Sequence, residues 1–158
     1  TSSATITVAP SVTASVTGNS AICIGDSVTL TASGGNNFSW SNGSTNSSIT
    51  VNPSSTTNYS VTVTSGICSD NASTTVTVNP LPTINIAGTT TICTGASTTL
   101  TASGGNNYSW NTGATSSSIT VIPSGNTSYT VTVTDANSCS NVDSINVVID
   151  SVTAVAPS

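Results

Sequence analysis

Residues 31–40 read TASGGNNFSW and residues 101–110 read TASGGNNYSW, so one ten-residue stretch occurs twice, with Phe38 in the first copy and Tyr108 in the second. The copies lie 70 residues apart. The same offset relates further residues of the two halves: Cys23 and Cys93, Leu30 and Leu100, Ile49 and Ile119, Pro53 and Pro123. A fixed internal period indicates a tandem repeat of one folding unit.

The repeat predicts where the units begin and end. We expect two full repeats, at residues 11–80 and 81–150. Residues 1–10 end in a segment that matches the last strand of a repeat, and residues 151–158 begin with a segment that matches the first. We therefore expect 1–10 to be the last strand of a preceding unit or a donor strand. Residues 151–158 are expected to be the start of a following unit or a terminal strand.

Hydrophobic residues alternate with Ser and Thr through both repeats. Val28, Leu30 and Ala32 fall on one face of a predicted strand, and threonines fall on the other. Threonine suits this role because its branched Cβ favours a pleated strand. Further alternating segments of the first repeat lie near residues 38–40, 49–51, 59–63 and 76–78, with counterparts in the second. Many short strands separated by Gly, Asn and Pro turns predict an all-β fold of tandem immunoglobulin-like β-sandwich domains.

Aromatic residues mark the expected cores. Trp40 and Trp110 end the third alternating segment of each repeat, on its inward face. Each tryptophan buries on the order of 200 Å² in a core position. Tyr59 and Tyr129 open the penultimate strand, where immunoglobulin-like domains place the tyrosine of their tyrosine corner. We predict that all four side chains belong to the cores.

The four cysteines form no Cys-X-X-Cys pair, and the chain has no histidine, which argues against zinc. Their even number predicts disulfides and an oxidising compartment. We expect one disulfide per domain, Cys23–Cys68 and Cys93–Cys139, each pinning one pole of its sandwich. A bridge closing about 45 residues restricts the unfolded chain by roughly 4 kcal/mol in the chain-entropy model. Reduction is therefore predicted to destabilise each domain severely.

Composition excludes several classes of function. The chain has no Lys, Arg, His or Met, and its five acidic residues are all aspartates, for a net charge of −5. General acid–base catalysis lacks its usual histidine, and anionic substrates lack cationic anchors. Nucleic-acid binding needs Lys or Arg, and an anionic membrane surface repels this charge. We expect no enzyme, no catalytic residue, no metal or cofactor, no nucleic-acid partner and no membrane insertion.

Two long segments carry a family resemblance. CIGDSVTLTASGGNNFSWSNGSTNSSITVNPSSTTNYSVTV (23–63) and CTGASTTLTASGGNNYSWNTGATSSSITVIPSGNTSYTVTVTDANSCS (93–140) resemble the tandem immunoglobulin-like repeats of large Bacteroidota surface proteins. The resemblance implies export to the cell surface, often through the type IX system, and a stalk that serves adhesion or gliding. Triplets of Asp, Ser and an aliphatic residue resemble the O-glycosylation motif of that phylum. The resemblance thus makes three serines candidate glycosylation sites: Ser27, Ser144 and Ser151.

These observations predict a structural extracellular protein, part of a filament or adhesin stalk built by serial stacking. The expected partner is the protein itself, in a covalent tandem array or in a polymer held by strand exchange. The strands lack the Lys residues that commonly protect sheet edges, which leaves strand exchange open. The alternative is a carbohydrate- or receptor-binding module that uses the loop tips at 34–37 or 42–47. Asp135 and Asn137 offer too few oxygens for calcium and are interpreted as an Asx turn.

Overall fold

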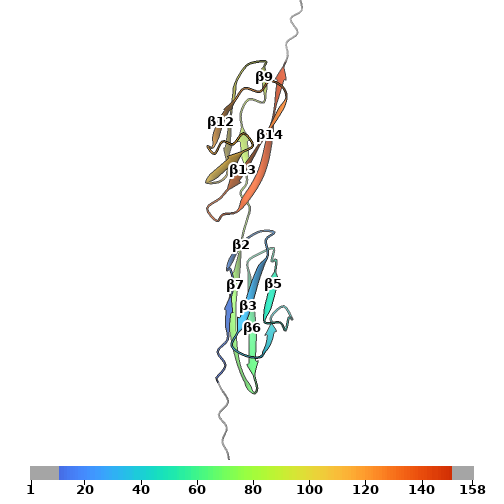
Figure 1. Ribbon diagram of the computed structural model, residues 1–158, viewed down its shortest axis with the longest axis vertical. Helices are drawn as coiled ribbons and strands as arrows, with labels where there is room; N and C mark the ends of the chain where they lie inside the picture. Colours follow the sequence, from blue (N-terminus) through green and yellow to red (C-terminus); the bar gives the residue numbers. More distant parts are fainter. Residues whose placement is uncertain (1–10, 151–158) are drawn as a thin grey trace, which may run out of the picture. The chain divides into compact units, whose positions relative to one another are not determined.

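The computed structural model describes residues 11–150 (Figure 1). The chain divides between Asn79 and Pro80 into two compact parts, here called unit 1 (residues 11–79) and unit 2 (residues 80–150). Both are built of strands and turns, with no helix in the described residues. The predicted all-β fold is confirmed.

Unit 1 consists of two antiparallel-rich sheets. Its strands are β1 (Ser15–Thr17), β2 (Ala21–Cys23), β3 (Val28–Ser33), β4 (Asn37–Trp40), β5 (Ser48–Val51), β6 (Thr57–Ser65) and β7 (Cys68–Asn79). The three-stranded sheet has the order β1-β3-β5, and the four-stranded sheet has the order β2-β7-β6-β4. The chain crosses between the sheets after each of the strands β1 to β5, and β2 runs parallel to β7. This is a small immunoglobulin-like sandwich whose opening segment is shared between both sheets.

Unit 2 repeats this architecture. Its strands are β8 (Asn85–Ala87), β9 (Thr91–Cys93), β10 (Thr98–Ser103), β11 (Asn107–Trp110), β12 (Ser118–Val121), β13 (Thr127–Thr134) and β14 (Ser140–Asp150). The sheets have the orders β12-β10-β8 and β11-β13-β14-β9, and β9 runs parallel to β14. The tandem immunoglobulin-like fold predicted from the sequence is therefore confirmed.

Each core lies between the two sheets of its unit. In β3 and β10, alternate residues are buried and exposed along the whole strand. Trp40 and Trp110 are each only 3% exposed, and Tyr129 is buried, whereas Tyr59 is half-buried at the margin of its core. The remaining buried side chains are mostly Val, Leu and Ile, so each core is small and depends heavily on its tryptophan.

Hydroxyl groups cover the outer face of each three-stranded sheet. Thr29 contacts Thr50 across β3 and β5 at 3.0 Å, and Thr31 contacts Ser48 at 2.9 Å. Unit 2 repeats both contacts one period later. Cross-strand hydroxyl pairs of this kind stabilise a sheet without charge. The Ser- and Thr-rich composition is thus accounted for by the solvent-facing half of the strands.

Candidate assembly surfaces at the poles of each unit

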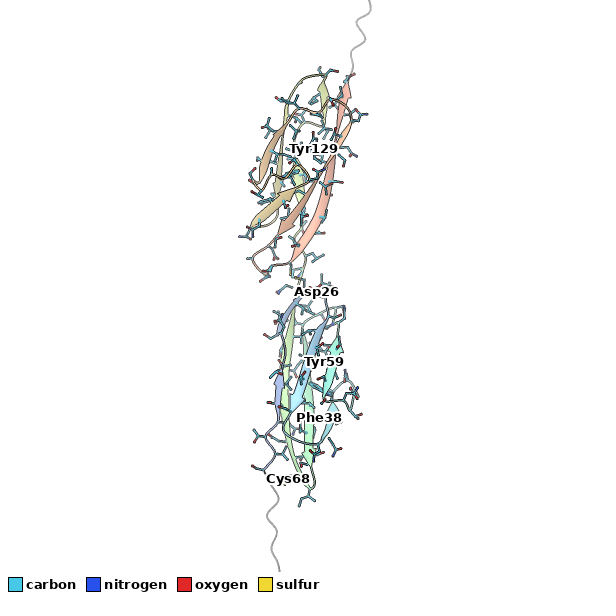
Figure 2. All side chains as sticks on the ribbon, in the orientation of Figure 1. Asp26, Phe38, Tyr59, Cys68 and Tyr129 are labelled. Atoms are coloured by element: carbon cyan, nitrogen blue, oxygen red, sulfur yellow. The ribbon has the colours of Figure 1, made fainter. Side chains whose placement is uncertain are left out.

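The chain enters unit 1 at one end of the sandwich and leaves it at the other. At the end called here the N-pole, the Ala14 backbone N–H donates to the Asp70 Oδ2 at 2.9 Å, beside the hairpin that joins β6 to β7. At the opposite end, the C-pole, the Ile24 N–H donates to the Asn79 carbonyl at 2.9 Å. Figure 2 shows Cys68 at the first of these ends and Asp26 at the second.

Unit 2 has the same two poles. At its N-pole the Asn141 Nδ2 donates to the Pro82 carbonyl at 3.0 Å, so a side chain of β14 again holds the incoming segment. At its C-pole the Cα partner of Cys93 is Asp150, the last residue of β14. Asn141 stands 71 residues after Asp70, in the equivalent position of its repeat. Sequence reasoning missed both anchors, because a polar residue in a Ser- and Thr-rich strand gives no distinguishing signal.

The two cysteines of each repeat lie at opposite poles. Cys68 is the first residue of β7, and the Cα partner of Cys23 is Asn79, the last residue of β7. At about 3.3 Å per residue, the strand between them spans roughly 36 Å. A disulfide needs Cα atoms within about 7 Å of each other. In unit 2, Cys139 directly precedes β14 and Cys93 pairs with its last residue, so the separation is the same.

The predicted pairs Cys23–Cys68 and Cys93–Cys139 are therefore wrong. Cys23 and Cys139 are disulfide-bonded, whereas Cys68 and Cys93 are free thiols. Cysteine number and spacing suggested a bridge within each repeat, but the parallel pairing of β2 with β7 moves Cys23 to the far end of the sandwich from Cys68. No disulfide closes a loop within either unit.

Reduction is now expected to have little effect on the stability of each unit. Because no loop within a unit is opened, the loss should be far below the roughly 4 kcal/mol that closure of about 45 residues contributes. Thermal melting with and without dithiothreitol, followed by far-ultraviolet circular dichroism, measures this. A drop of 10 °C or more on reduction would contradict the placement of the cysteines at opposite poles.

Backbone hydrogen bonds stabilise the charged form of the Asp70 carboxylate. The backbone N–H of Ala14, and next that of Asn71, stabilise its ionised form and hold its pKa below the ordinary 3.8. A carboxyl whose pKa is lowered on folding adds stability above its unfolded pKa, and that stability disappears as the pH falls through the folded pKa. Asp70 therefore makes the attachment of the incoming segment of unit 1 sensitive to acid.

We predict that Asp70→Asn reduces the loss of unit 1 stability below pH 4. The asparagine oxygen can still accept the Ala14 N–H, but it does not titrate, and it reproduces the residue type of Asn141 in unit 2. Differential scanning calorimetry of the wild type and the variant between pH 6 and pH 2 measures this. Identical pH profiles would contradict a role for Asp70 in the acid response.

The loops at 34–37 and 104–107 are nearly identical for a packing reason. Gly34 has φ +114°, and a Cβ there would lie 2.0 Å from the Thr13 carbonyl oxygen. At Gly35 a Cβ would lie 2.7 Å from the Thr64 carbonyl oxygen. Gly104 and Gly105 meet the same restrictions in unit 2. The glycines allow the segment that enters each unit to pass close to the loop. This packing requirement explains why the loop sequence is repeated, without a ligand that both loops bind.

The loop at 42–47 is held by the core tryptophan. The Trp40 Nε1–H donates to the Asn46 carbonyl at 2.8 Å, and the Trp110 Nε1–H donates to the Ser116 carbonyl at 3.0 Å. A buried tryptophan N–H needs such a partner. The loop at 42–47, which was considered for ligand binding, is therefore hydrogen-bonded to the core tryptophan, and so is its counterpart in unit 2.

The Asp135 carboxylate is used within its own hairpin. Its Oδ1 accepts the N–H groups of Asn137 at 2.8 Å and Cys139 at 2.9 Å, which is the geometry of an Asx turn. Within residues 11–150, no three His, Cys, Asp or Glu side chains gather closely enough to hold a metal ion. The same residues contain no helix long and apolar enough to cross a membrane.

Two of the three candidate glycosylation serines can be placed. Ser27 is exposed at the C-pole of unit 1, where its Oγ lies 3.4 Å from the Asn52 Nδ2. Ser144 is exposed in the middle of β14. Ser151 lies outside the described residues. Modification of Ser27 and Ser144 is sterically open and stays a prediction.

Comparisons with known proteins were made against family models, curated proteins and solved structures. No family model and no curated protein matches the chain. The chain is similar to a solved structure of the three N-terminal domains of the highly immunogenic outer capsid protein (Hoc) of bacteriophage RB49, with 20% identity and a TM-score of 0.49. The match covers 88% of this chain and 59% of that one. The immunoglobulin-like fold rests on the strand order and burial described above.

Proposed function

We propose that the chain is a structural extracellular protein whose immunoglobulin-like units act by serial stacking, in a cell-surface filament or an adhesin stalk. The observation that carries this proposal is the position of the two poles. Each unit receives the chain at one end of its sandwich and releases it at the other. Units with entry and exit at opposite poles can be joined in series, one repeat after another.

The side chains of the described residues support a mechanical role over a chemical one. Asp70 and Asp135 hold backbone N–H groups, and the chain has no Lys, Arg or His to act with them. Every buried side-chain nitrogen or oxygen in residues 11–150 has a hydrogen-bond partner. A reactive site usually retains polar groups that are not fully satisfied or have strongly shifted pKa values. We therefore propose no enzymatic activity.

An extracellular location fits the cysteines and the charge. Disulfide bonding of Cys23 and Cys139 requires an oxidising compartment in most organisms. A net charge of −5 without cations favours solubility of a densely repeated surface structure. The absence of Lys and Arg also removes every trypsin site, an advantage outside the cell.

Two ways of building the filament are open to this architecture. In a covalent array, each unit continues directly into the next through a short segment such as residues 80–82, which contains two prolines. In a strand-exchanged polymer, a terminal segment of one copy adds to an open sheet edge of another. The edge strands of unit 1 are β1 and β5 in one sheet and β2 and β4 in the other.

Electron microscopy of native material, followed by boiling in non-reducing and reducing SDS, tests the proposal. We expect long fibres. Reduced fibres that yield only the 15.5 kDa chain indicate assembly from separate copies, and very large chains after reduction indicate a tandem stalk. Isolated short particles that bind on a glycan array would refute the structural role and favour a carbohydrate- or receptor-binding module.

A further inference from the structure

The two free thiols of the described residues lie at unlike poles of different units. Cys68 is half-buried at the N-pole of unit 1, and Cys93 is exposed at the C-pole of unit 2. Next to Cys68, at the tip of the hairpin, Ile67 is 95% exposed.

The repeat shows what these positions do elsewhere in the same chain. Cys93 is the equivalent of Cys23, and Cys68 is the equivalent of Cys139. Cys23 and Cys139 are both disulfide-bonded. The backbone settings also correspond, since Cys23 pairs with the end of β7 and Cys93 with the end of β14. Each free thiol therefore occupies a site that forms a disulfide in the other repeat.

Neither free thiol has a partner in its own unit. The second cysteine of each unit lies at the opposite pole, roughly 36 Å away along a single strand. The two thiols also lie at unlike poles, Cys68 at an N-pole and Cys93 at a C-pole. A bond between unlike poles is heterologous, and heterologous contacts that do not close into a ring form open filaments.

We propose that Cys93 of one copy forms a disulfide with Cys68 of the next copy, which links this chain head to tail into a covalent fibre. The proposal rests on the proposed function and adds the bond that holds its subunits. The step oxidises two thiols to one disulfide and releases two protons and two electrons. The oxidant is a second disulfide, either a small-molecule disulfide or an oxidoreductase, which is reduced to two thiols by exchange.

The experiment uses the intact chain, as an equal mixture of ¹⁵N-labelled and unlabelled copies, oxidised with glutathione disulfide. Cleavage before aspartate suits this sequence because its five aspartates place every cysteine in a different peptide. Cys23 lies in 1–25, Cys68 in 26–69, Cys93 in 70–134 and Cys139 in 135–142. We expect peptide 26–69 linked to peptide 70–134, with about half of these pairs carrying mixed isotopes.

Non-reducing gels with matched variants provide a second readout. The wild type is expected to form a ladder of multiples of 15.5 kDa that collapses on reduction. Cys68→Ser and Cys93→Ser should each form nothing larger than a dimer, and the double variant should stay monomeric. Neither serine replaces a core side chain, so we expect the variants to melt at the wild-type temperature. This measurement is the control that the variants fold.

Several results would overturn the proposal. They are links between two copies of the same peptide in the wild type, links without mixed isotopes, and a ladder that persists in the double variant. Fibres seen by electron microscopy in which Cys68 and Cys93 still react with iodoacetamide would also overturn it, while leaving the structural function intact. The absence of fibres together with the absence of the link would count against both.

Discussion

Replacing Trp40 by alanine is expected to destabilise unit 1 by about 3–5 kcal/mol, which is the usual cost of truncating a large core aromatic. Trp40 is 3% exposed and lies among small aliphatic side chains that cannot fill the space it leaves. The substitution also removes the N–H that holds the loop through Asn46. A sandwich of this size has a total stability of similar magnitude, so unit 1 should be largely unfolded.

Fluorescence separates the two units in this experiment. Trp40 and Trp110 are the only tryptophans of the chain, so the Trp40→Ala variant reports on unit 2 alone. We expect the Trp110 fluorescence of this variant to show that unit 2 unfolds at the same denaturant concentration as in the wild type. The circular dichroism signal of β-structure should fall by about half, because unit 1 is unfolded. Trp110→Ala is the reciprocal control. A Trp40→Ala protein with wild-type calorimetric transitions would contradict the central place of this side chain in the core.

Gly34→Ala is expected to destabilise unit 1 by about 3 kcal/mol, since it combines an unfavourable backbone conformation with overpacking. The added Cβ would lie 2.0 Å from the Thr13 carbonyl oxygen, so the incoming segment must move away from the loop. Backbone, unlike the end of a long side chain, cannot give way cheaply. Urea unfolding monitored by Trp40 fluorescence in a Trp110→Phe background measures the loss.

Gly43→Ala is the matched control. Gly43 also has a positive φ, +85°, but nothing lies within 4 Å of the position that an added Cβ would take, so only the conformational cost of about 1 kcal/mol applies. The difference between the two variants therefore reports the close approach of residues 13 and 14 to the loop. Equal destabilisation by both would show that the approach is not tight.

Strand and core positions were accessible from the sequence because they depend on local patterns. Alternation identified the buried face of β3 through Val28, Leu30 and Ala32, and the 70-residue offset transferred the result to unit 2. Tyr59 illustrates the limit of this reasoning. Its position in the repeat is that of the buried Tyr129, yet it is only half-buried.

The arrangement of the cysteines was not accessible, because it depends on which strands pair. Sequence spacing placed Cys23 and Cys68 at one pole, and nothing local indicates that β2 runs parallel to the far end of β7. The anchors Asp70 and Asn141 escaped notice for a related reason. Each contacts a residue more than fifty positions earlier in the chain, and their side chains differ between the repeats.

The parallel pairing of β2 with β7 also determines how a unit responds to tension. Pulling on the two ends of unit 1 draws β2 toward the N-pole and the end of β7 toward the C-pole, so the two strands slide along each other. Their hydrogen bonds, including Thr77 N–H to Ser20 O and Ile24 N–H to Asn79 O, lie across the direction of the force. They are loaded together and must break together, whereas an antiparallel hairpin pulled from its open end gives way one bond at a time. With β9 and β14 arranged in the same way, each unit contains a parallel strand pair that resists shear between the point where the chain enters and the point where it leaves.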